Sequence, residues 1–316
     1  MLRVGVINNS RSQRNRRRLA EMRDFLAGRP ETRHVILDGI AGLSETLADF
    51  ARREVGVLAL GGGDGTVQAT LTALFTERPF ERMPFIAVLP RGTTNMIAAD
   101  AGVRPRQLGR FLDLARDGQL DPVTVERRVL RLANARGRAP QYGMFFGGAG
   151  IYRAVLACRA KVHPWHVVAD AAAALTLGGL LLRWLVPGAQ GGGIVRGDPI
   201  GVTVDGRELG TRSYLLVLAT TLDRLLMGSR PFWGDDSRGV RFTVIGYPPR
   251  RLACHVRKVL YGGAARHLPE GYDSLSADSV RLAMDCPFIL DGELFEAERD
   301  RPVELTAHER VRLVRL

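Results

Sequence analysis

Short apolar runs alternate with amphipathic segments along the first 120 residues. Apolar residues recur at helical spacing between these runs, and Val67, Leu71 and Leu74 form one such stripe. A continuous apolar run bounded by turn residues is typical of a strand buried on both faces of a parallel sheet. The runs lie at residues 3–8, 33–38, 55–60 and 84–90. The pattern therefore predicts a Rossmann-like α/β domain at residues 1–120, with helices between successive parallel strands.

Beyond residue 120 the pattern changes to one strand-like segment after another. A single helical region, residues 151–186, is expected to interrupt them. This succession of strand-like segments predicts a second domain, a β-sandwich at residues 121–305, with the tail at 306–316 returning to the first domain. The apolar stretch at 165–188 is interrupted by Asp170 and Arg183, so its uncharged run is too short to span a bilayer. We expect a buried or interface-lying helix there.

The charge of the chain indicates which binding partners to expect, and its cysteines indicate where it is located. The 316 residues carry a formal net charge of +12, and only Lys161 and Lys258 are lysines. Such a surface favours anionic partners, among them nucleotides and acidic lipid headgroups, unless it only reflects a preference for arginine codons. No patch interleaves basic and aromatic residues, so nucleic acid is not expected. The three cysteines are widely spaced, and the N-terminus lacks the apolar core of a signal peptide, so a cytoplasmic protein is expected.

A glycine-rich loop follows the third predicted strand. It reads GGGDGT, with Gly62, Gly63, Asp64, Gly65 and Thr66 just before a helical pattern. Glycines let backbone N–H groups approach an anion, and a helix N-terminus adds its dipole. A carboxylate beside a phosphate cradle indicates magnesium, which prefers oxygen ligands. The alternative is a tight turn in which Asp64 caps the following helix.

Two further loops have the same design. The second reads LPRGTTNMIA and presents Gly92, Thr93, Thr94 and Asn95 after the fourth strand, although Asn95 could serve as a plain N-cap. The third follows the first strand and carries Asn9 and Ser12, with a solvated basic helix start as its alternative. Loops at the ends of successive parallel strands meet at one crevice, where such folds bind ligands. We therefore expect a phosphate site there.

A late element, FILDGELFEA, carries Asp291 and Glu293 on either side of a glycine. If the backbone is extended, both carboxylates share one face and fit a general base with a neighbour that orients it. The alternative is a β-turn with Asp-Gly at its tip, as expected for the similar VDGRE at 204–208.

These elements in this order resemble the diacylglycerol kinase catalytic-domain family, which includes bacterial lipid kinases and sphingosine kinases. The family's GGDGT, LPxGTxN and DGE motifs are present at residues 62–66, 89–95 and 291–293. The N-terminal NPxSG motif is degraded, because only Asn9 and Ser12 match it. The segment PFWGDDSRGVRFTVI resembles one that supplies a structural magnesium site in some members, with altered spacing around Asp235 and Asp236.

The resemblance implies an ATP-dependent lipid kinase, a phosphotransferase that acts on a hydroxyl of a diacylglycerol-like amphiphile in phospholipid metabolism. It implies ATP and Mg²⁺ as cofactors, held by the three loops and Asp64, with Asp236 as a further metal ligand. It implies that Asp291 or Glu293 takes the proton from the lipid hydroxyl. Expected partners are the lipid substrate and an anionic membrane contacted peripherally, and a homodimer is one compatible assembly. The alternatives are a soluble small-molecule kinase similar to NAD kinases and a non-catalytic nucleotide or lipid binder.

Overall fold

The computed structural model describes residues 2–12, 22–29, 31–92, 94–162, 196–235, 237–263 and 266–316. The chain divides into two compact units. The first comprises Met1–Arg127 together with Arg310–Leu316, and the second comprises Arg128–Glu309. Each unit has its own sheet and its own buried core.

The described part of the first unit contains a six-stranded sheet in the order β2-β1-β3-β4-β17-β5. β1 pairs in parallel with β2 and β3, β3 with β4, and β4 with β17. The strands span Arg3–Asn9 (β1), Thr32–Leu37 (β2), Val55–Gly62 (β3), Phe85–Pro90 (β4), Thr124–Arg128 (β5) and Arg310–Val314 (β17). All residues of β3 except Gly56 are buried, which explains its continuous apolar run.

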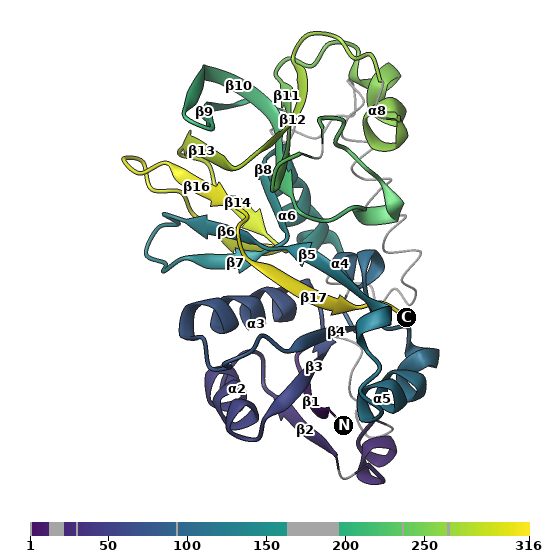
Figure 1. The fold of residues 1–316 in the computed structure, drawn as a ribbon. Coiled ribbons are helices and arrows are strands. Elements are labelled where there is room, and N and C mark those ends of the chain that lie inside the picture. Colours follow the sequence, from purple (N-terminus) through teal and green to yellow (C-terminus); the bar gives the residue numbers. More distant parts are fainter. Residues whose placement is uncertain are drawn as a thin grey trace. The chain divides into compact units, whose positions relative to one another are not determined.

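Helices cover both faces of this sheet (Figure 1). α2 (Leu43–Arg52) and α3 (Asp64–Glu77) lie on one face, and the phenyl ring of Phe50 packs on Gly5, where a Cβ would come within 2.4 Å of the ring. α5 (Leu108–Arg116) packs on the other face, where Phe111, Leu112 and Ala115 join the core with Val4 and Val57. Residues 22–27 are also helical and bury Met22 and Leu26 in that core.

Short helices connect the later strands of the first unit. They are α4 (Met96–Asp100), the 3₁₀ turn η1 (Pro105–Gln107) and the 3₁₀ turn η2 (Asp121–Val123). Asp100 forms a buried ion pair with Arg127 of β5, at 2.8 Å between Oδ2 and Nε. This pair ties α4, which follows the second predicted phosphate loop, to the strand that leads into the second unit.

The described part of the second unit contains an eleven-stranded, antiparallel sheet. Its longest strand, β10 (Arg207–Thr220), pairs with β9 along its first half and with β8 and β11 along its second half. The strands span Leu130–Ala133 (β6), Gln141–Gly143 (β7), Phe145–Ala149 (β8), Asp198–Val204 (β9), Val240–Gly246 (β11), Tyr272–Ala277 (β12), Ser279–Met284 (β13), Phe288–Leu290 (β14), Glu293–Phe295 (β15) and Val303–Thr306 (β16). The predicted fold class, an α/β domain followed by an antiparallel β domain, is confirmed.

Two helices accompany the second sheet in the described ranges. α6 (Gly150–Val162) begins the predicted helical region, most of which lies outside the described residues. α8 (Leu252–Tyr261) was not predicted, so the expectation of a single helical interruption was wrong. Its apolar side chains, Leu252 and Val259, pack with Leu215, Ile245 and Tyr272 in a small separate core. The short 3₁₀ turn η3 (Leu226–Gly228) is joined to α8 through the Arg230 N–H, which donates to the Leu260 carbonyl.

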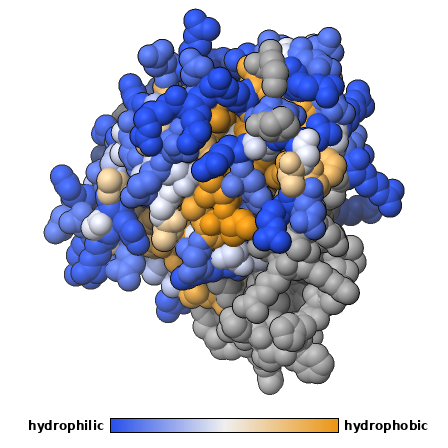
Figure 2. Space-filling view, turned by 90° about the horizontal axis from the view of Figure 1, so that it is seen from below, coloured by the Kyte–Doolittle hydropathy of each residue, from blue (hydrophilic) through white to orange (hydrophobic). Residues whose placement is uncertain are grey.

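The molecular surface is rich in hydrophilic residues (Figure 2), as the high content of charged residues in the sequence leads one to expect. The face drawn in Figure 2 is largely hydrophilic, with hydrophobic residues exposed in one central area. None of the helices in the described ranges is both long and apolar enough to cross a membrane. The predicted interface-lying helix at 165–188 lies outside the described residues.

Candidate functional site

The three predicted phosphate loops meet at the carboxyl ends of β1, β3 and β4. Asn9, the last residue of β1, donates from Nδ2 to Thr66 Oγ1 at 3.0 Å. The Ser12 hydroxyl donates to the Arg91 carbonyl at 2.6 Å. Each bond joins two loops that are far apart in sequence, so the structure brings together Asn9, Ser12 and Thr66 as the sequence predicted.

Glycine is required in the loops that follow β3 and β4, because the backbones of these two loops touch. A Cβ on Gly92 would lie 2.4 Å from the Gly63 Cα, and one on Gly63 would lie 3.2 Å from the Gly92 Cα. The Arg91 N–H donates to the Gly62 carbonyl at 3.2 Å across the same contact. A Cβ on Gly62 would collide with the Thr66 side chain at 2.4 Å. The glycines of GGDGT and LPxGT therefore allow the two loops to pack against each other.

Asp64 links the two loops through its carboxylate. Oδ2 accepts hydrogen bonds from the Thr94 hydroxyl at 2.8 Å and from the Met96 N–H at 3.0 Å, and Oδ1 accepts one from the Ile97 N–H at 3.1 Å. The residue is 6% exposed. Burial raises the pKa of this carboxyl group, and the three hydrogen bonds oppose that rise. The carboxylate thus clamps the start of α4 onto the first turn of α3.

This contact corrects one alternative raised by the sequence. Asp64 is the first residue of α3, yet its carboxylate bonds to the N-terminal N–H groups of α4, so it does not cap the helix that follows it. The N-cap residue of α3 is Gly63, and within the described residues no side-chain cap hydrogen bond forms at this helix end. A helix N-terminus without a side-chain cap offers backbone N–H groups to an anion.

Asn95 closes the second loop on itself. Its Oδ1 accepts the Gly92 N–H at 2.6 Å, and its Nδ2 donates to the Gly92 carbonyl at 2.7 Å. Asn95 occupies the N-cap position of α4 in the left-handed conformation, with φ 46°, but its side chain makes no capping bond. Asparagine tolerates this conformation better than most residues, which explains the residue type. Thr93, also predicted for this loop, lies outside the described residues.

The carboxylates predicted for catalysis belong to the second unit, where the backbone is not extended. Asp291 and Gly292 have positive φ of 47° and 85° and form the two-residue turn of the β14–β15 hairpin, in which Leu290 pairs with Glu293. The prediction that both carboxylates share one face was therefore wrong: Asp291 is 3% exposed, whereas Glu293 is exposed. Asp205–Gly206 forms the same kind of turn between β9 and β10, as expected.

The carboxylate of Asp291 is held by β8 and the residue before it. Oδ2 accepts the Met144 N–H and Oδ1 accepts the Phe145 N–H, both at 2.9 Å, while the Asp291 N–H donates to the Phe145 carbonyl at 2.8 Å. Within the described ranges, no hydrogen bond or ion pair holds the Glu293 side chain. The two carboxylates therefore differ in role: one is fixed by backbone donors and the other is free to rotate.

Asp235, the neighbour of the predicted metal ligand Asp236, bonds to two serines. Its oxygens accept hydrogen bonds from the hydroxyls of Ser237 and Ser276, and these bonds lower the pKa of the carboxyl group. Asp236, predicted as a metal ligand, lies outside the described residues. Among the described residues, no group of three or more His, Cys, Asp or Glu side chains is arranged to hold a metal ion.

Some residues of the site carry no signal in the sequence. Met96 and Ile97 contribute only backbone N–H groups to Asp64, and Met144 and Phe145 do the same for Asp291. Any residue but proline supplies such a donor, so residue type could not reveal them. Arg91 contributes its backbone as well, through its N–H to the Gly62 carbonyl and its carbonyl to the Ser12 hydroxyl.

Comparison with known proteins shows which family the loop-bearing part of the chain resembles. Residues 3–127 match the model of the diacylglycerol kinase catalytic domain. A protein of Salmonella arizonae named "Probable lipid kinase YegS" is 36% identical over 95 residues, which is 30% of this chain and 31% of that protein. An Enterobacter protein named "Probable lipid kinase YegS-like" is 42% identical over 65 residues, 21% of each chain. The matched stretches thus span less than a third of these relatives.

Solved structures extend the likeness to the fold of the whole chain. A diacylglycerol kinase from Bacillus anthracis has a TM-score of 0.63 and 15% identity, covering 99% of this chain and 97% of the other. An NAD kinase from Archaeoglobus fulgidus, solved in complex with ATP, has a TM-score of 0.52 and 10% identity, covering 99% and 94%. The predicted resemblance to the diacylglycerol kinase catalytic-domain family is therefore confirmed through its domain at residues 3–127, and the solved structures share the fold of the chain.

Proposed function

We propose that this protein is an ATP-dependent lipid kinase that transfers the γ-phosphate of ATP to a hydroxyl group of a diacylglycerol-like amphiphile. The observation that carries the proposal is the packing of three loops at one edge of a parallel sheet, with Gly63 against Gly92 and the start of α3 without a side-chain cap. Phosphoryl transfer needs mainly positioning and charge neutralisation, which such loops supply. The names of the relatives supply the lipid as acceptor class.

The nucleotide would bind through the backbone of these loops and the hydroxyl groups beside them. Gly63 and Gly92 let the two loops pack against each other, and Thr94 and Thr66 present hydroxyls. The oxygen groups at these loops are the Asp64 carboxylate and the hydroxyls of Thr66 and Thr94, and oxygen ligands fit Mg²⁺ bound jointly with phosphates rather than in an all-protein cage. Asp64 would hold the ion through Oδ1, which accepts a single hydrogen bond. When bound, Mg²⁺ neutralises phosphate charge.

Either Asp291 or Glu293 would accept the proton of the lipid hydroxyl. Two backbone N–H groups hold the carboxylate of Asp291 and fix its position. Glu293 is exposed and unrestrained within the described residues, so its carboxylate is free to rotate. Substitutions separate the two roles, since Asp291→Asn should lower both stability and activity, whereas Glu293→Gln should lower activity alone.

The test is transfer of labelled phosphate from ATP to extracted lipids, with thin-layer identification of the product. Wild type is compared with Glu293→Gln, Asp291→Asn and the control Glu208→Gln, whose exposed carboxylate lies on β10. We expect the control to keep full activity and at least one of the other two to lose activity 10²-fold or more, on the order of a general base's contribution. Folded, nucleotide-binding protein that labels no lipid would contradict the proposal, and label in NAD or another soluble acceptor would favour a soluble kinase.

The same proposal includes peripheral contact with an anionic membrane. Arg257, Lys258 and Tyr261 are exposed on α8, and Met227, 47% exposed, lies in the turn joined to that helix. Basic side chains near a surface of anionic lipid contribute about 1 kcal/mol each, and this attraction is screened by salt. Flotation with phosphatidylglycerol vesicles should carry the protein upward at low salt and not at 1 M salt. No flotation in either condition would contradict membrane contact.

A further inference from the structure

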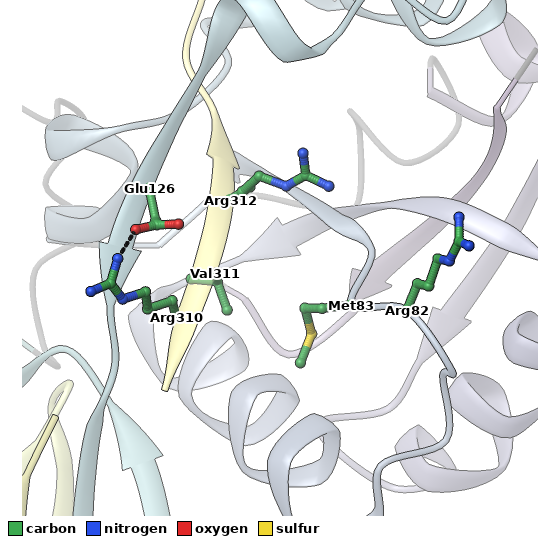
Figure 3. Close-up of a pocket in the computed structure, with 6 residues that line it drawn as sticks. All are labelled: Arg82, Met83, Glu126, Arg310, Val311 and Arg312. Carbon is green, nitrogen blue, oxygen red and sulfur yellow. Dashed lines mark hydrogen bonds and ion pairs between the residues drawn. The ribbon is translucent and has the colours of Figure 1, made fainter. Parts of the chain in front are cut away.

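A pocket of about 390 Å³ lies in the first unit, at the edge of the sheet opposite the phosphate loops. It is lined by Arg82, Met83, Glu126, Arg310, Val311 and Arg312 (Figure 3). Arg82 and Met83 precede β4, and Arg310 begins β17, which is parallel to β4. The pocket is therefore at the amino ends of these strands, whereas the loops follow the carboxyl end of β4. Six residues of strand separate the two edges by about 20 Å, so the pocket is not part of the nucleotide site.

The pocket has an excess of positive charge. Three arginines and one glutamate line it, which leaves a formal charge of +2. Arg310 is paired with Glu126, and Arg312 Nη1 lies 2.7 Å from Asp121 Oδ1. Within the part of the chain that the structure describes, no hydrogen bond or ion pair engages Arg82. In Figure 3, Arg310 points toward Glu126, while Arg312 extends toward the side on which Arg82 lies.

Arg312 is held in place before any ligand arrives. Its guanidinium carbon lies 4.1 Å from the ring centroid of Phe85, and its ion pair with Asp121 fixes the other side. A planar guanidinium that is already ordered loses less entropy when it forms a hydrogen bond. Met83 adds an apolar side chain beside the arginines, and Figure 3 shows it extending toward Val311, which is 1% exposed and lies on the buried face of β17.

This combination selects a class of ligand. Guanidinium groups bind phosphate oxygens in pairs, with charge-assisted hydrogen bonds that are stronger than neutral ones. The volume of about 390 Å³ leaves room for more than an inorganic phosphate ion. We propose that this pocket binds the phosphate group of a small phosphate ester, carried either by a soluble metabolite or by the headgroup of a phospholipid. The proposal does not depend on the kinase activity proposed above.

Calorimetric titration with glycerol 3-phosphate tests the soluble form of the ligand. Arg82→Ala and Arg312→Ala should each weaken binding about tenfold, equivalent to ~1.4 kcal/mol. Glu126→Gln removes the only acid in the lining and should tighten binding, a gain that misfolding cannot produce. The control Arg138→Ala removes the same charge from an exposed turn of the second unit and should leave the affinity unchanged.

Vesicles of phosphatidylglycerol, compared with vesicles of phosphatidylcholine, test the lipid form. Loss of flotation in Arg82→Ala and Arg312→Ala, but not in Arg138→Ala, would assign the pocket to an anionic lipid headgroup. Unchanged flotation together with weakened glycerol 3-phosphate binding would assign it to a soluble ester. If substitutions at Arg82, Arg312 and Glu126 leave both kinds of binding at wild-type strength, the proposal is refuted.

Discussion

The contact between Gly63 and Gly92 gives the sharpest test of how the phosphate loops are built. A Cβ at position 92 would lie 2.4 Å from the Gly63 Cα, whereas ordinary contacts of this kind begin near 3.4 Å. In Gly92→Ala the two backbones must therefore part by about 1 Å. Overpacking of this kind costs roughly 1–3 kcal/mol of unfolding free energy, and a displacement of 1 Å in a binding geometry can cost about 10²-fold in rate.

Two further substitutions should give a smaller loss than Gly92→Ala or no loss, because their added Cβ atoms meet less crowding. Gly63→Ala places its Cβ 3.2 Å from the Gly92 Cα, so the shift needed is only about 0.2 Å and a smaller loss is expected. Gly109→Ala in α5 meets no atom within 4 Å and should raise stability by about 0.5 kcal/mol, as alanine does in helices. The order of loss should be Gly92→Ala, then Gly63→Ala, then none for Gly109→Ala.

Affinity for a non-hydrolysable ATP analogue and urea denaturation measure the two consequences separately. The structural reasoning predicts that Gly92→Ala binds the analogue much more weakly while remaining folded at low urea. If Gly92→Ala binds the analogue as tightly as wild type, the contact between the loops does not shape the nucleotide site. If all three alanine variants lose affinity equally, the effect is not specific to this contact.

Three other predictions follow from the buried Asp64 and from the half-buried Cys286 and His34. Asp64→Asn should lower the unfolding free energy by about 1–3 kcal/mol in urea, even with EDTA and no nucleotide, because its amide nitrogen would face a backbone N–H; equal stability would contradict the clamp. Burial, together with the charge of Asp198, raises the pKa of Cys286 from 9.0 to about 11. At pH 8 iodoacetamide should therefore modify this thiol about 100-fold more slowly in the folded protein than in the unfolded chain, because only the thiolate reacts. Peptide mass spectrometry measures the two modification rates. Equal rates would exclude that shift. Burial and Arg23 lower the pKa of His34, so the unfolded chain takes up a proton that the folded chain resists, and stability should fall as pH drops below about 6.5. His34→Gln should flatten this dependence in urea titrations between pH 5 and 7, and an unchanged slope would disprove it.

The glycine-rich loops were predictable because each lies between a buried strand and a helix, and the topology of parallel strands brings such ends together. Their mutual contact was not predictable, since it depends on a close approach of Gly63 to Gly92 that no spacing reveals. Asp64 illustrates the same limit. The sequence places it at the start of α3, but its partners come from α4, more than thirty residues later.

The Asp-Gly pairs show why Asp291 and Glu293 do not share one face: the preference of Asp-Gly for a tight turn decides the backbone there. Asp291–Gly292 and Asp205–Gly206 adopt the same left-handed turn, which asparagine, aspartate and glycine favour wherever two strands must reverse. The turn separates Asp291 from Glu293 in exposure, and only the three-dimensional fold supplies the backbone donors at Met144 and Phe145. α8 was missed because the sequence around it was dominated by strand-like segments.

The position of β17 between β4 and β5 has a consequence for biosynthesis. Arg310 follows Pro90 by 220 residues, yet its strand hydrogen-bonds to β4 in the sheet that carries the phosphate loops. Until residues 310–314 emerge from the ribosome, β4 has an unpaired edge that can pair with other chains. We expect nascent chains arrested before residue 310 to recruit chaperones or aggregate, and the sheet to complete itself only after the second unit has been synthesised.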